Sequence, residues 1–98
     1  MNAPLFQVGP SAMQRKWVGS ADYKLLINAL KEVRISAGLS QRELARRLGK
    51  PPSFVNKIEL LERRLDILEF IAIANALDVP AEALLLKLAA VLPNELRL

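Results

Sequence analysis

A helix–glycine–helix pattern between residues 40 and 59 constrains this chain more than any other feature. Ser40 and Glu43 have the S-x-x-E spacing of a capping box, which starts a helix. Gly49 supplies the left-handed residue that ends it. Pro52 then suits the first turn of a second helix, because its missing N–H would be unpaired there anyway. The pattern predicts two short helices joined by a tight turn.

Apolar spacing predicts three further helices around this pair. The first begins after Ser20 and ends at Gly38, with apolar residues at three- and four-residue spacing: Leu26, Leu30, Val33 and Ala37. A D-x-x-E start at Asp66 predicts a helix over about residues 66–77, and a last helix is expected over about 81–90. We therefore expect an all-α chain that forms a compact five-helix domain.

The two ends of the chain differ from this domain. Residues 1–19 hold two prolines and two glycines among scattered apolar side chains, without a helical period, so we expect an extended or partly disordered N-terminal arm. Within it, residues 5–8 are a candidate short strand. Trp17 is expected to pack onto the domain or a partner, with stacking on a base as the alternative. The domain is expected to span residues 20–90, and residues 91–98 form a short tail.

Positive charge gathers around the helix pair. Seven of the fourteen lysine and arginine residues lie between residues 42 and 64, whereas residues 65–98 carry two basic and five acidic side chains. The net charge of +4 is compatible with a polyanionic partner, although solvated helix faces are the alternative interpretation. A surface that binds a polyanion is therefore expected on the first two thirds of the chain.

The composition excludes several kinds of function. Without Cys or His, the chain has no disulfide, zinc finger, thiol nucleophile or imidazole base. It also lacks a glycine-rich phosphate loop and carboxylates clustered at catalytic spacing, so we expect no enzyme, no metal and no cofactor. No apolar run approaches the roughly 20 residues that span a bilayer. We expect a cytoplasmic protein without a secretory signal or a membrane partner.

Two short helices joined by a tight turn and surrounded by basic residues match the geometry with which proteins enter the DNA major groove. On the second helix Val55 and Ile58 share one side, which leaves polar residues elsewhere. The candidates for base readout are Pro52, Ser53, Asn56 and Lys57. The candidates for phosphate contact are Ser40, Gln41, Arg42, Lys50, Arg63 and Arg64.

From about Leu30 to Leu85 the chain resembles the Xre/Cro/cI-type helix-turn-helix domain of bacterial and phage repressors. The resemblance lies in residues 39–45, Leu48-Gly49, residues 53–59 and residues 62–66. It implies a lambda-repressor-like, five-helix domain that regulates transcription by binding palindromic double-stranded DNA as a homodimer, most simply as a repressor. It also implies a buried ion pair between Arg34 and Glu59, with DNA contact as the alternative role for Arg34.

The chain departs from that family in three places. Pro51 and Pro52 stand where Ser or Thr and then Gln are usual, so base readout there is lost or becomes an apolar contact. Leu60 and Leu61 replace a polar residue and Gly or Asn, so the helix could run on. The third departure is a second apolar stripe on the fourth helix, at positions that are commonly polar.

The extra apolar stripe suggests an interface with a second copy of the chain. The alternative is a core that also covers the N-terminal arm or the C-terminal tail. The interface candidates are Leu68, Ile71, Ala72, Leu84, Leu85 and Leu88. The same apolar features support a second hypothesis, an antitoxin-type interaction module that neutralises a toxin or binds another regulator and autoregulates its operon.

Overall fold

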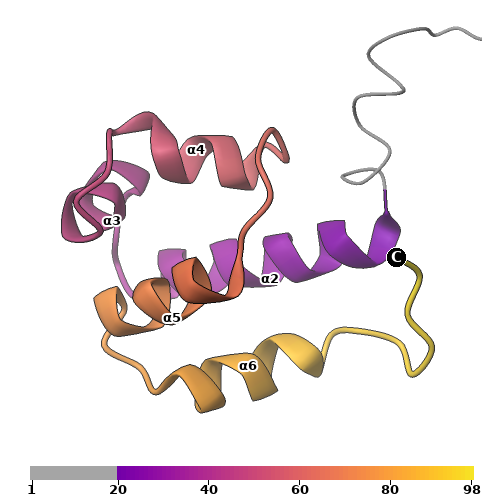
Figure 1. The fold of residues 1–98 in the computed structure, drawn as a ribbon. Coiled ribbons are helices and arrows are strands. Elements are labelled where there is room, and N and C mark those ends of the chain that lie inside the picture. Colours follow the sequence, from indigo (N-terminus) through magenta and orange to yellow (C-terminus); the bar gives the residue numbers. More distant parts are fainter. Residues whose placement is uncertain (1–19) are drawn as a thin grey trace, which may run out of the picture.

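The structure, a computed structural model, describes residues 20–98 and contains five helices in that range (Figure 1). They are α2 (Ala21–Ser36), α3 (Gln41–Arg47), α4 (Ser53–Glu59), α5 (Ile67–Ala76) and α6 (Ala81–Ala89). No strand occurs between residues 20 and 98, and the predicted all-α, five-helix fold is confirmed. The expectations for residues 5–8 and Trp17 lie outside the described residues.

Side-chain caps fix the starts of α3 and α5. Ser40 Oγ accepts the Glu43 N–H at 3.0 Å, as the capping box predicts. The Glu43 carboxylate, however, binds two arginines of α3 instead of returning to Ser40. A full capping box starts α5: Asp66 accepts the Glu69 N–H at 2.7 Å and Glu69 accepts the Asp66 N–H at 3.1 Å.

Four of the helices end in the same way, with a left-handed residue that reverses the chain. The residues are Gly38, Gly49, Leu61 and Asp78, with φ of 77°, 69°, 64° and 60°. After α4, the Leu61 N–H donates to the Ile58 carbonyl at 3.0 Å and the Glu62 N–H to the Lys57 carbonyl at 2.8 Å, which is a Schellman motif. α4 therefore stops at Glu59, although a leucine in this conformation costs about 1–2 kcal/mol.

The inner sides of the helices form one core, with α4 on one side of α2 and α6 on the other (Figure 1). Its buried members come from all five helices: Leu30, Leu44, Ala45, Val55, Ile73, Ala74, Leu77, Leu84 and Leu88. Leu84 and Leu88 are only 3% and 2% exposed, because their four-residue spacing places both on the inner side of α6. This corrects their expected place in a dimer interface. Among residues 20–98, no helix has the length and apolar character needed to cross a bilayer.

Candidate nucleic-acid interface

α4 has a buried side and a polar side. Val55 and Ile58 are buried in the domain, whereas Ser53 and Lys57 are exposed and Asn56 is half-buried. Pro52 is exposed in the turn just before the first residue of α4, with no side-chain cap on the helix. All four predicted base-readout residues therefore lie on or next to the outer side of one short helix.

A buried ion pair holds α4 against α2. Arg34 Nε and Nη2 donate to the two carboxylate oxygens of Glu59 at 2.7 and 3.1 Å, and Nη1 donates to the Leu39 carbonyl at 2.7 Å. The two side chains are 9% and 8% exposed. Arg34 thus points into the fold toward Glu59. The contact joins the last turn of α2 to the last turn of α4.

Gln41 belongs to the same network. Its Nε2 donates to Glu59 Oε1 at 2.7 Å, which connects the first turn of α3 to the last turn of α4. The side-chain amide of Gln41 therefore links the two helices of the pair to each other. Its predicted contact with a DNA phosphate stays a prediction.

A salt-bridge cluster covers the exposed side of α3. Glu43 accepts hydrogen bonds from Arg46 at 2.9 and 2.6 Å and from Arg47 at 3.0 Å. These bonds to Arg46 and then Arg47 lower the pKa of Glu43 from 4.5 to about 2. Two arginines share one carboxylate, so the cluster keeps a net positive charge at neutral pH.

An open hollow of about 490 Å³ lies between the start of α3 and the start of α4. It brings together three of the predicted phosphate residues, Ser40, Arg42 and Lys50, with the base-readout candidate Pro52. Arg46 and Glu43 complete its lining. Residues that are up to twelve positions apart therefore face one basic depression beside the polar side of α4.

Phe54 and Glu69 hold the side chain of Arg63 next to α4. Arg63 donates to both carboxylate oxygens of Glu69, at 2.8 and 2.7 Å, and its guanidinium carbon lies 4.8 Å from the centroid of the Phe54 ring. Lys50 Nζ lies 5.5 Å from the same centroid. The hydrogen bonds from Arg63 lower the pKa of Glu69. Arg63 is therefore held at the edge of α4, and its phosphate contact stays a prediction.

Sequence reasoning missed the roles of Phe54 and Glu69. The D-x-x-E spacing indicated Glu69 only as a capping residue, and Phe54 only as part of the family resemblance. Arg64, the last phosphate candidate, is exposed, and its guanidinium carbon lies 4.4 Å from the centroid of the Tyr23 ring. Tyr23 gave no signal in the sequence, because the first turn of α2 and this loop are about forty residues apart.

Two short helices joined by a tight turn, with the second exposing a polar side next to basic residues, define a helix-turn-helix DNA-binding domain. The helix-turn-helix family matches residues 30–84, more than half of the chain. The chain belongs to this family as an Xre-type protein, and it is a DNA-binding transcriptional regulator. No curated protein matches the chain.

Solved structures of similar proteins agree with this family assignment. An XRE-family like protein from Pseudomonas syringae pv. tomato is 46% identical, with 80% of this chain and 95% of that chain covered and a TM-score of 0.68. The restriction-modification controller protein C.AhdI from Aeromonas hydrophila is 33% identical, with 65% and 97% covered and a TM-score of 0.59. The hypothetical transcription factor NHTF from Neisseria is 28% identical, with 74% and 76% covered and a TM-score of 0.57.

Proposed function

We propose that the protein is a homodimeric repressor that reads a palindromic operator by placing α4 in the major groove. The observation that carries the proposal is the outward polar side of α4, formed by Ser53, Asn56 and Lys57 while Val55 and Ile58 are buried. Asn can pair with the edge of adenine, Lys with guanine, and Ser with several acceptors. Such a regulator acts in the cytoplasm, where bacterial DNA lies.

The basic hollow supports the same docking. Ser40, Arg42 and Lys50 lie together beside α4. With α4 in the major groove, these residues would face the DNA backbone at one edge of the groove. The exposed ring of Pro52 can contact only an apolar group such as a thymine methyl. We therefore assign base readout to the outer side of α4 and affinity to the surrounding basic residues, with Arg64 at the far end.

Arg64→Ala tests the phosphate assignment. We expect weaker binding to all DNA sequences and a salt slope that is reduced by about 0.9, because one phosphate contact releases about 0.9 counterion. Mobility shifts on DNA upstream of the gene, at several salt concentrations, measure this. Lys87→Ala is the control, because Lys87 is exposed on α6, and it should leave the salt slope unchanged. If the wild-type protein shows no salt-sensitive shift with any upstream DNA, the proposed function is wrong.

Apolar side chains on α5 and α6 support the dimer. Leu68 is 73% exposed, and four others are also exposed in the single chain: Ile67, Ile71, Leu85 and Leu86. Ala72 is half-buried beside them. Ile67, Ile71 and Leu85 line one apolar groove. A soluble monomer rarely leaves such an apolar surface in water, so we assign these exposed side chains to an interface with a second copy. Two copies of α4 about 34 Å apart would meet successive major grooves on one side of the duplex.

Leu68→Glu tests the interface. A carboxylate at this position would lose its hydration in the interface, so we expect a shift from dimer to monomer with little change in folding. Light scattering at micromolar protein concentration measures the mass. Leu25→Glu is the matched control, because Leu25 is exposed on α2 and should leave the dimer intact. A wild-type protein that is strictly monomeric at this concentration would contradict the homodimer.

The same exposed side chains also favour the second candidate, an antitoxin that binds a toxin and represses its own operon. A partner that co-purifies in stoichiometric amount with the wild-type protein, and is lost from Leu68→Glu, would support it. The two candidates share the DNA-binding side of the molecule and differ only in what covers α5 and α6.

A further inference from the structure

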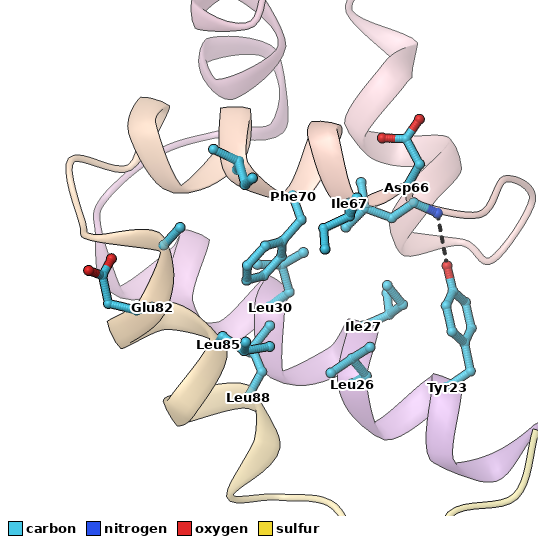
Figure 2. Close-up of a pocket in the computed structure, with 13 residues that line it drawn as sticks. Tyr23, Leu26, Ile27, Leu30, Asp66, Ile67, Phe70, Glu82, Leu85 and Leu88 are labelled. Carbon is cyan, nitrogen blue, oxygen red and sulfur yellow. Dashed lines mark hydrogen bonds between the residues drawn. The ribbon is translucent and has the colours of Figure 1, made fainter.

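Tyr23, in the first turn of α2, contacts the loop between α4 and α5 at two consecutive residues. Its hydroxyl oxygen accepts the Leu65 backbone N–H at 3.3 Å, as Figure 2 shows. The guanidinium carbon of Arg64 lies 4.4 Å from the centroid of its ring. One contact fixes the backbone of the loop, and the other restrains the arginine side chain.

Tyr23 is well placed to act as a fixed support, because the first turn of α2 is itself tied down. Ser20 Oγ accepts the Tyr23 N–H at 3.3 Å and donates to the Arg97 carbonyl at 2.8 Å. Asp22 Oδ2 accepts the Arg97 N–H at 2.7 Å. The C-terminal segment is thus hydrogen-bonded to the start of α2.

Apolar surroundings orient the ring. Tyr23 lines one end of a groove of about 400 Å³ between α2, α5 and α6, together with Leu26, Ile27 and Ile67 (Figure 2). The apolar body of the tyrosine therefore belongs to this groove while its hydroxyl reaches the loop. This arrangement suits an amphipathic side chain with one apolar end and one polar end.

We infer that Tyr23 is a positioning residue for DNA binding, which holds Arg64 in the orientation that meets the DNA backbone. The inference rests on the proposed function. A free arginine side chain gives up much rotamer freedom when it binds a phosphate, whereas one that already lies on an aromatic face gives up less. Arg64 follows α4 in the chain, so it is suited to a flanking phosphate and not to a base edge.

Two substitutions separate the ring from the hydroxyl. Tyr23→Met removes both and keeps an apolar side chain of similar length in the groove, whereas Tyr23→Phe removes only the hydroxyl. We expect Tyr23→Met to weaken DNA binding about two- to fivefold, the range of an exposed cation–π contact, and to flatten the salt slope. Tyr23→Phe should keep the slope. Leu26→Ala, which removes apolar contacts from the same groove, is the matched control and should also keep it.

A double-mutant cycle with Arg64→Ala gives the decisive readout, measured by mobility shifts on protein whose folding is checked by circular dichroism. In the Arg64→Ala background, Tyr23→Met should cause no further loss of affinity or slope. Equal losses in the two backgrounds would overturn the inference, because a purely structural role does not depend on Arg64. If the wild-type protein binds DNA in a salt-sensitive way and Tyr23→Met has the same salt slope, the inference is overturned but the proposed function is not. Wild-type protein without salt-sensitive binding would overturn the proposed function as well.

Tyr23→Phe provides a second test that does not depend on the stability of Tyr23→Met. Because phenylalanine cannot accept the Leu65 N–H, amide hydrogen exchange at Leu65 should become faster in this variant than in the wild type. An unchanged exchange rate at Leu65 would overturn the role of the hydroxyl in holding the loop.

Discussion

Glu59→Ala is expected to lower the free energy of unfolding by about 3–5 kcal/mol, the usual cost of removing one partner of a buried ion pair. Arg34 would stay inside the fold without the carboxylate that accepts its Nε and Nη2. Gln41 would lose its acceptor as well. Urea unfolding followed by circular dichroism measures the change by linear extrapolation.

Two controls show whether the loss comes from the stranded arginine. The double variant Arg34→Met/Glu59→Leu removes both charges, and we expect it to be clearly more stable than Glu59→Ala, since apolar side chains often replace a buried pair at little cost. Glu62→Ala removes an exposed carboxylate from the same turn and should change stability by less than about 0.5 kcal/mol. A Glu59→Ala effect as small as that of Glu62→Ala would contradict the structural role of the pair.

Lys57→Ala is expected to relax specificity at one base pair of the operator, with a loss of about 1–3 kcal/mol in discrimination. Lys57 is exposed on α4 among the residues assigned to base readout, so its ammonium group is available to a guanine edge. The free energy of unfolding should change by less than about 0.5 kcal/mol, because the side chain is at the surface. Fluorescence anisotropy with the operator and its single-base variants measures the discrimination.

Arg64→Ala is the natural comparison for Lys57→Ala. Both remove one exposed cation, but the loss from Arg64→Ala should be nearly uniform across sequences, whereas the loss from Lys57→Ala should concentrate on one base pair. If the two variants lose affinity equally on every DNA tested, the division between base readout and phosphate contact is wrong.

The helices follow from local signals, which is why the sequence predicts all five to within a few residues. Ser40, Gly49 and Asp66 act on neighbouring backbone groups, so their effect is visible in the sequence itself. The end of α4 is harder to predict, because Leu61 takes the left-handed conformation where glycine or asparagine is usual. The backbone hydrogen bonds from the Leu61 and Glu62 N–H groups to carbonyls of α4 close the turn there without a glycine.

Side-chain partners far apart in the chain are harder to predict. The contact of Arg63 with Glu69 and Phe54 depends on how α4 and α5 meet, and no spacing rule describes it. The resemblance to a known family implied the contact between Arg34 and Glu59, which residue patterns alone left open. The dimer assignment was partly wrong for the same reason, since only the packing of α6 shows that Leu84 and Leu88 are buried.

The most direct test of the central claim is a nuclear magnetic resonance titration of the protein with a duplex selected from random DNA. If α4 enters the major groove, the largest chemical-shift changes should fall on Ser53, Asn56 and Lys57, with smaller changes at the start of α3 and at Arg64. Signals from the exposed side of α6, such as Lys87, should change little. Large changes on α6 with α4 unchanged would contradict the account.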